Sequence, residues 1–239
     1  MRRPRVCLLA AALVVCTFQA GAAGLRSFAA LPLGKGGGVA WVMLGHEFDA
    51  DSTRAEPVIG IGLSGTQSLF LYLPFSSDRT SHLNRGDPGV LYRHTLWQVD
   101  SPGATARAAL LAGFVLPTDE DRDVRIRAGF VATVARRWFE LDADWLWIEG
   151  TGDAGDGARY DLSWQVRLPP FSKRYLTQGY EWRLVTELDG RWAEGSTFAH
   201  QAVLGLQRVG KRWIFEGGVA RDLNTTHNAS LMLGGRLRF

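Results

Sequence analysis

The chain has 239 residues, and its 27 lysines and arginines exceed its 24 acidic residues by three. Arg2, Arg3 and Arg5 stand at the start, so the chain that follows them is formally neutral. This balance argues against a nucleic-acid-binding protein, which would carry a clustered basic face. Beyond the start, no apolar stretch approaches the roughly 18 residues of a membrane-spanning helix, which excludes helical spans.

The first 23 residues have the pattern of a secretory signal peptide. A basic start is followed by an apolar core over 7–18 and by small residues at 20–23, where cleavage is expected. The core is too short to cross a bilayer as a helix. Both cysteines, Cys7 and Cys16, lie inside this leader, so the exported chain has no thiol and no disulfide. We therefore expect a leader over 1–23.

The exported chain alternates apolar and polar residues with a period of two. In 138–149, apolar and aromatic side chains alternate with Glu140, Asp142 and Asp144, which places the two kinds on opposite faces of one strand. The same pattern predicts about twelve strands in a single domain, 24–239. The predicted strands cover 38–48, 57–64, 68–75, 89–99, 104–117, 124–135, 138–149, 158–168, 180–189, 196–209, 212–222 and 228–239.

These strands favour an all-β protein, an antiparallel transmembrane β-barrel with lipid outside and a polar lumen. A soluble β-sandwich or a lipocalin-like barrel is the alternative, because regularly spaced strands fit those folds too. The tryptophans and tyrosines gather near strand ends, as a membrane girdle requires. That distribution favours the membrane barrel.

The connections between the predicted strands alternate in length. Short periplasmic turns and longer outer loops are the expected asymmetry of such barrels. The short turns lie at 65–67, 100–103, 136–137 and 210–211, and the longer loops at 76–88, 150–157 and 222–228. One connection, 169–178, is long for a turn on the periplasmic side. The stretch 24–37 is rich in glycine, and we expect it to be a flexible lead into the first strand rather than a plug.

The last predicted strand is apolar on one face up to the terminal residue, Phe239. A strand that ends on a terminal aromatic residue resembles the closing strand of bacterial outer-membrane β-barrels. The resemblance implies a protein in the outer membrane of a Gram-negative bacterium. Its implied partners are the lipid bilayer and the barrel-assembly machinery, which would bind the strand ending at Phe239.

A second resemblance rests on motifs in the first half of the chain. These motifs are PVIGIGLS at 57–64, LYLPF at 71–75, GDPGVLYR at 86–93 and GFVLPT at 113–118. They resemble the outer-membrane protein family named for the meta-cleavage pathway of phenol degradation. That resemblance implies transport of small hydrophobic or aromatic solutes. The residues that match its rim motif are Pro74, Gly86, Asp87 and Pro117.

These four residues also have a purely structural explanation. Proline lacks a backbone N–H, so Pro74 and Pro117 should each end a strand's ladder at the rim. Gly86 and Asp87 suit a turn into the next strand. A gating or ligand-binding role for Asp87 is the less favoured interpretation.

The polar faces of the predicted strands carry the candidate residues for function. Opposite charges on adjacent strands can pair across the ladder. They would form either a cross-linked interior that fills a narrow barrel or a water-filled pore whose charges set selectivity. The candidates are Arg125, Arg127, Glu140, Asp142, Asp144, Arg159, Asp161, Arg167, Glu181, Arg183, Glu187 and Asp189.

Three functions follow from these patterns. The favoured one is a channel for small solutes, and the second is a non-conducting barrel with a structural or surface-binding role. A lipid-modifying enzyme is the third, but it would need a histidine beside a serine nucleophile. The five histidines lie in no such motif, and we expect no enzymatic activity, no cofactor and no metal. They are His46, His82, His94, His200 and His227.

Overall fold

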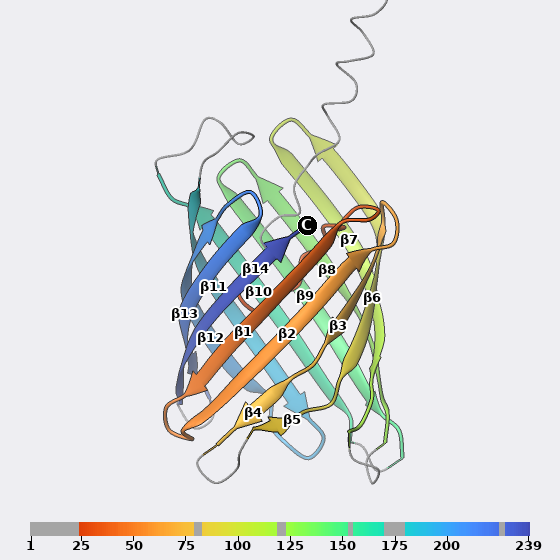
Figure 1. The fold of residues 1–239 in the computed structure, drawn as a ribbon, viewed down its shortest axis with the longest axis vertical. Coiled ribbons are helices and arrows are strands. Elements are labelled where there is room, and N and C mark those ends of the chain that lie inside the picture. Colours follow the sequence, from red (N-terminus) through yellow and green to blue (C-terminus); the bar gives the residue numbers. More distant parts are fainter. Residues whose placement is uncertain (1–23, 79–82, 119–122, 153–154, 170–179, 225–227) are drawn as a thin grey trace, which may run out of the picture.

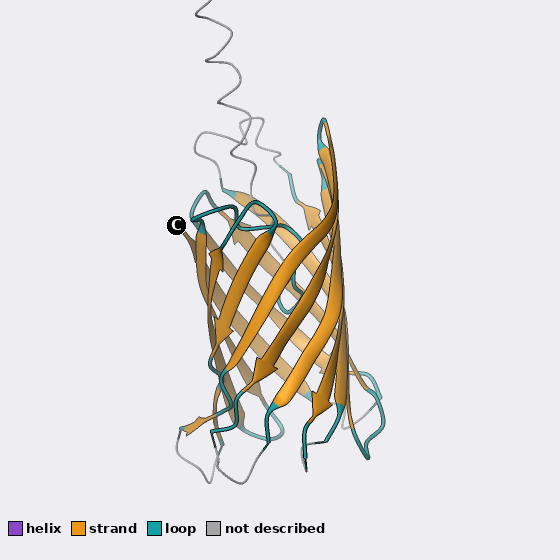
Figure 2. Ribbon diagram, turned by 90° about the vertical axis from the view of Figure 1, so that its right-hand side faces the viewer, coloured by secondary structure: helices purple, strands orange, loops and turns teal. Residues whose placement is uncertain are grey.

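The computed structural model describes residues 24–78, 83–118, 123–152, 155–169, 180–224 and 228–239. These residues form one antiparallel sheet that closes into a barrel (Figure 1). Figure 2 shows strands on the near and the far side of the barrel, tilted steeply relative to its axis. None of the described residues forms a helix long and apolar enough to cross a membrane.

The sheet has fourteen hydrogen-bonded strands within the described part of the chain. Two of them are short, since β4 continues β3 beyond Pro74 and β5 precedes β6. The closed wall of the barrel is therefore twelve strands around. The strands are β1 (Gly38–Glu47), β2 (Ser52–Gly62), β3 (Gln67–Tyr72), β4 (Phe75–Ser77), β5 (Asn84–Arg85), β6 (Gly89–Ser101), β7 (Ala104–Val115), β8 (Arg125–Arg136), β9 (Phe139–Gly150), β10 (Gly157–Arg167), β11 (Glu181–Ala193), β12 (Ala199–Val209), β13 (Trp213–Asp222) and β14 (Ala229–Arg238).

The barrel closes where β1 pairs with β14. The register joins Val39 to Arg238 and continues to Glu47, opposite Ser230. At the rim, the backbone N–H of Gly38 donates to the carbonyl of Phe239 at 2.7 Å. All neighbouring strands are antiparallel, as predicted, because each is joined to the next by a turn or loop at one end of the barrel.

One end of the barrel carries short turns, and we call it the short-turn end. Strands β6 and β7 are joined there by two residues, 102–103, and β8 and β9 by 137–138. The other end, the long-loop end, carries the longer connections such as 151–156. Phe239 lies at the short-turn end (Figure 1), in agreement with the predicted alternation. Of the long connection predicted at 169–178, residues 170–178 lie outside the described residues.

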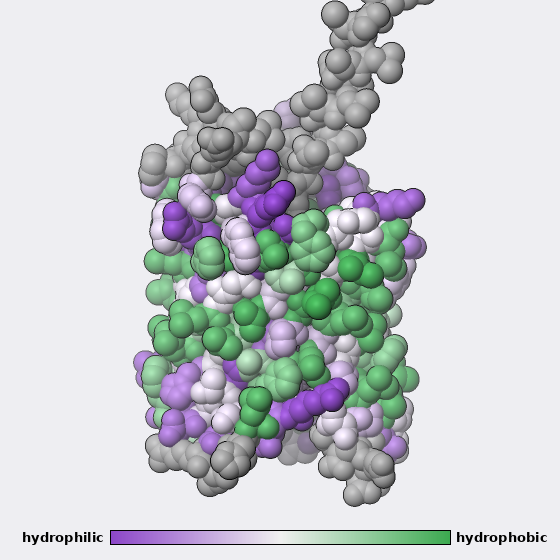
Figure 3. Space-filling model, viewed as in Figure 1, coloured by the Kyte–Doolittle hydropathy of each residue, from purple (hydrophilic) through white to green (hydrophobic). Residues whose placement is uncertain are grey.

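The two faces of each strand separate apolar from polar side chains as the sequence predicts. Exposed apolar side chains point outward, and examples are Ile59 at 53% exposure, Phe130 at 53% and Leu204 at 58%. On the face drawn in Figure 3, apolar residues form a green band across the middle of the barrel, with hydrophilic residues toward both ends. Trp138 and Tyr180 stand exposed near the short-turn end. A lipid-facing band with aromatic residues at its edges is the surface of an outer-membrane barrel.

The stretch 24–37 departs from the prediction. We expected a flexible lead into β1, but its residues pack inside the barrel, where Leu25, Ala30 and Leu31 are buried. Gly34 and Gly36 have positive φ angles of 75° and 76°, which glycine adopts without strain. They turn the chain from the interior back to the start of β1. The expected flexible lead is therefore wrong for this segment.

Candidate functional site in the barrel lumen

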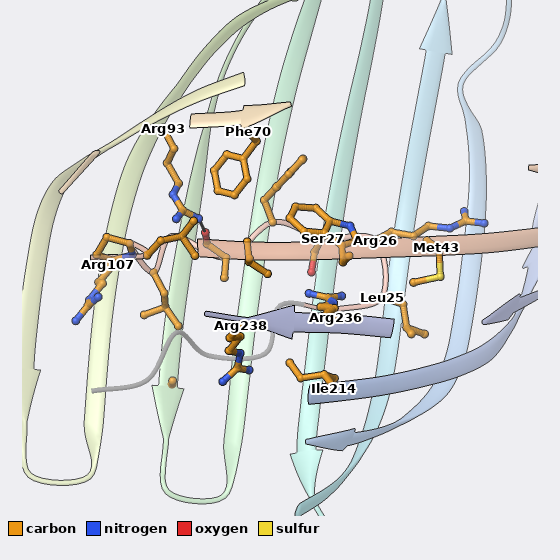
Figure 4. Close-up of a pocket in the computed structure, with 18 of the residues that line it drawn as sticks. Leu25, Arg26, Ser27, Met43, Phe70, Arg93, Arg107, Ile214, Arg236 and Arg238 are labelled. Carbon is orange, nitrogen blue, oxygen red and sulfur yellow. Dashed lines mark hydrogen bonds between the residues drawn. The ribbon is translucent and has the colours of Figure 1, made fainter. Parts of the chain in front are cut away.

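The lumen is crossed by the stretch 24–37, which we call the lumen segment. Its apolar residues pack on two parts of the inner wall (Figure 4). Leu25 contacts a cluster that includes Val185 and Met232 on β11 and β14. Ala30, with Phe28 and Leu33 beside it, joins a second cluster from β1 to β9. The lumen segment thus supplies part of the apolar core that a polar-lined barrel otherwise lacks.

The wall also holds the backbone of the lumen segment by hydrogen bonds. The N–H of Ala30 donates to Thr133 Oγ1 at 2.8 Å, and the carbonyl of Ala30 accepts from Thr95 Oγ1 at 3.3 Å. The guanidinium of Arg93 donates to the carbonyl of Ala29. These wall residues are all buried. A backbone removed from water needs such partners, so the wall is built to receive an extended chain.

Two carboxylates of the wall accept further backbone N–H groups. The N–H of Phe28 donates to Asp144 Oδ2 at 2.9 Å. The N–H of Arg26 donates to Glu187 Oε2 at 3.1 Å. Hydrogen bonds to an ionised acceptor are stronger than neutral ones. The acidic strand faces therefore bind the lumen segment, a use that the sequence did not indicate.

Three aspartates lie side by side on neighbouring strands. The register pairs Asp161 with Asp144 on one side and with Asp189 on the other. We call Asp144, Asp161 and Asp189 the acidic row. Like charges directly opposite are destabilising in a sheet, so the row requires cations. Arg159 lies 2.9 Å from Asp161 and 3.6 Å from Asp144, and Arg26 of the lumen segment lies 2.9 Å from Asp189.

A second charge cluster lies nearer the short-turn end. Arg183 Nη1 is 2.8 Å from Glu140 Oε2, and Arg183 Nε is 2.6 Å from Glu181 Oε1. Arg167 lies 3.2 Å from the same oxygen of Glu181. Arg183 and Glu140 are buried, so each neutralises a charge that water does not reach. This cluster cross-links β9, β10 and β11 from inside the barrel.

We expect Arg183→Met to lower the free energy of unfolding by about 3 kcal/mol, because it leaves Glu140 as a buried charge without its cation. The measurement is equilibrium urea unfolding of the protein refolded into lipid vesicles. Arg54→Met is the control, since Arg54 pairs with Glu47 in an exposed position, where an ion pair contributes about 0–1 kcal/mol. Equal losses in the two variants would contradict the cross-linking role of Arg183.

Opposite charges on adjacent strands pair as predicted between β9 and β10 and between β10 and β11, but the arginines of β8 pair elsewhere. Arg127 lies opposite Ile148, so it is displaced along the strand from the carboxylates of β9. Its guanidinium lies 4.9 Å from the ring centre of Tyr72 instead. Arg125 forms an ion pair with Asp87 at 3.3 Å. The sequence fixes which face a side chain takes, but the register decides which charges meet.

The rim motif acts as strand-end structure. Strand β3 stops at Tyr72 and the ladder resumes only after Pro74, and β7 stops two residues before Pro117. The N–H of Gly86 donates to the carbonyl of Pro74 at 2.8 Å, in an approach too close for a Cβ.

Asp87 joins three elements at the long-loop end. Its carboxylate accepts from both the N–H and the hydroxyl of Thr118 at 3.0 Å and pairs with Arg125 at the start of β8. These contacts tie the approach to β6 to the chain that follows β7. They support the structural interpretation of Asp87 over a gating one.

The predicted lumen candidates all lie on inward faces of β8 to β11. Around the lumen segment a cavity of about 1360 Å³ remains. Among the described residues that line it are eleven arginines and five carboxylates. Arg107, Arg136 and Arg238 stand toward the short-turn end, while Glu47 and Asp222 stand toward the long-loop end. Arginines therefore outnumber carboxylates among the residues that line the free space of the lumen.

Two of the three histidines with a described position contact tyrosines, and the third, His46, lies 3.0 Å from Thr53 Oγ1 through its Nδ1. His94 Nδ1 lies 3.3 Å from the hydroxyl of Tyr92, and His200 Nδ1 lies 2.8 Å from that of Tyr160. His82 and the residue at position 227 lie outside the described residues. Within the described ranges, histidine and carboxylate side chains form no group of three placed to hold a metal ion.

Comparisons with solved structures agree on the fold. A structure described as "KdgM porin" superposes with a TM-score of 0.55 at 8% identity, covering 84% of this chain and 99% of that one. A structure described as "NanC porin structure in rhombohedral crystal form" gives a TM-score of 0.53 at 10% identity, covering 83% and 98%. No protein-family model and no curated protein sequence matches the chain. The fold is that of outer-membrane β-barrels of the porin kind, and the phenol-degradation resemblance stays a prediction.

Proposed function

We propose that the protein is an outer-membrane channel for small solutes, and that aromatic solutes with an anionic group are its preferred class. The observation that supports this most directly is the arginine-rich cavity inside a closed barrel. Guanidinium groups bind carboxylates with paired donors, and charged linings set the selectivity of pores. Phe28, Trp41 and Phe70 lie among the same lining residues, and their rings offer surfaces for an aromatic solute.

The proposed location is the outer membrane of a Gram-negative bacterium, reached through the leader 1–23. The apolar outer band supports a lipid-facing barrel. The pairing of Phe239 with Gly38 makes the last residue part of the closing seam. A machinery that assembles barrels would bind this strand before the seam forms.

A second candidate function has a specific observation in its favour. The lumen segment crosses the lumen, so the barrel could be non-conducting and act through its loops. The third candidate, a lipid-modifying enzyme, is the one we do not favour. We propose that the protein is not an enzyme. The contacts of His94 and His200 support that proposal, because among the described residues each imidazole is hydrogen-bonded to a tyrosine hydroxyl and neither to a serine.

Single-channel recording in planar bilayers tests the channel. We expect steady conductance, a reversal potential that shows anion preference in a KCl gradient, and block by added benzoate. Arg238→Gln should weaken the anion preference, since Arg238 lines the cavity. Arg208→Gln is the control, because Arg208 lies over the ring of Tyr180, away from the cavity lining. A silent barrel would favour the second candidate, and cation preference would remove the arginine argument.

A further inference from the structure

Gly24, the first residue described, lies deep in the barrel against polar wall groups. A Cβ on Gly24 would come within 1.9 Å of Glu187 Oε1 and 2.4 Å of Ser163 Oγ, so a side chain there would displace these polar groups. Its backbone nitrogen donates to Ser27 Oγ at 3.1 Å. Its carbonyl accepts from the guanidinium of Arg236. The start of the lumen segment is thus held from several sides.

Within the described ranges, the carboxylate of Glu187 at this point of the wall has no ion-pair partner. Glu187 is only 5% exposed. Its partners are the N–H of Arg26 at 3.1 Å and the hydroxyl of Ser27 at 3.5 Å. Ser163 is fully buried, and its hydroxyl has no hydrogen-bond partner in the part of the chain that the structure describes. A buried carboxylate without an ion pair and a buried hydroxyl without a hydrogen bond are both costly. A positively charged hydrogen-bond donor placed between them would satisfy both groups.

The sequence supplies such a donor at this residue. The small residues at 20–23 predict that a signal peptidase hydrolyses the bond between Ala23 and Gly24. Water adds across that bond, so the leader leaves with a carboxylate and Gly24 keeps a free amine, which takes up a proton. An ammonium group has three donors where the uncut chain has a single amide N–H.

We propose that the α-ammonium group of Gly24, created by leader removal, binds Glu187 and Ser163 inside the lumen and fixes the lumen segment there. The ammonium group donates one hydrogen bond to the hydroxyl of Ser27 and the other two to Glu187 and Ser163. The uncut chain offers only a neutral amide at the same place, so processing adds the charge that the wall requires. Leader removal then acts on the interior of the barrel as well as on export.

The test compares two forms of the chain that starts at Gly24, refolded into lipid vesicles. One form keeps its free amine. The other is acetylated at that amine, at a pH where lysines stay protonated. Both are unfolded in urea in the wild-type and Glu187→Gln backgrounds. In the wild type we expect acetylation to lower the folded-to-unfolded ratio by about tenfold or more, as loss of a charged hydrogen bond does.

In Glu187→Gln we expect acetylation to have a much smaller effect, because the anion is already gone. Ser163→Ala, which keeps the anion, should retain most of the acetylation effect and covers the case in which Glu187→Gln does not fold. Equal effects in the wild type and Glu187→Gln, or no effect in the wild type, would overturn the proposal. So would an amino terminus other than Gly24 in protein purified from outer membranes. These readouts do not depend on conductance, so the channel proposal can fail separately.

Discussion

Arg26→Ala should release the lumen segment and raise the conductance of the barrel. Arg26 lies 2.9 Å from Asp189, which is buried at the end of the acidic row, and it also donates to Gln201. Removing one partner of a buried ion pair costs about 3–5 kcal/mol. A loss of about 3 kcal/mol lowers the ratio of bound to released segment roughly 100-fold. Single-channel recordings should therefore show a new, larger conductance level that the wild type reaches rarely.

Arg208→Ala is the matched control for this prediction. It removes an arginine that lies over the ring of Tyr180 and does not touch the lumen segment. Its conductance levels should equal those of the wild type. If Arg26→Ala also leaves every level unchanged, the lumen segment does not limit conduction.

Gly62→Leu should affect stability and conductance more than Arg26→Ala, because it blocks the path of the lumen segment at the short-turn end. Gly62 exchanges backbone hydrogen bonds with Gly36 and Gly37 at 2.9 and 2.8 Å. A Cβ at this position would lie 1.6 Å from the carbonyl oxygen of Gly34, and backbone cannot yield as a side-chain tip can. The leucine must displace this end of the segment, including Leu33, which packs against the cluster from β1 to β9. We expect a loss of at least about 3 kcal/mol in the free energy of unfolding, together with a larger conductance.

The control for Gly62→Leu is Gly235→Leu. Gly235 lies in β14, and the nearest atom to its added Cβ would be 4.0 Å away on Phe215. This variant makes the same change within a strand and should unfold at the same urea concentration as the wild type. A Gly62→Leu protein with wild-type stability and wild-type conductance would show that the lumen segment can take another path.

The strands and their faces could be predicted because both depend on local sequence. A two-residue alternation such as that of Glu140, Asp142 and Asp144 is visible within a few residues and decides which side chains point inward. The number of strands around the barrel followed from counting such segments. Register could not be predicted in this way, because it depends on where two distant strands meet. The inward direction of the β8 arginines could be predicted for this reason, whereas their actual partners, Asp87 and Tyr72, could not.

The lumen segment was missed for a different reason. Its glycines at 34, 36 and 37 suggested flexibility, yet the residues before them, 25–33, are mostly apolar, and an exposed flexible lead has no need of apolar residues. The apolar composition of 25–33 therefore indicates that this stretch is buried. The partners of the segment could not be read in advance, since Ser68, Thr133 and Glu187 come from β3, β8 and β11. They converge only when the barrel closes.

The wall holds the lumen segment mainly through its backbone. Leu33 donates its N–H to Ser68 at 3.4 Å, and the N–H groups of Phe28 and Ala30 bind wall side chains in the same way. Every residue but proline carries such a donor. Mutations can therefore alter many side chains of the segment and keep its attachment, whereas a change at a wall acceptor removes one bond outright. Related barrels should consequently differ more in the segment than in the wall residues that receive it.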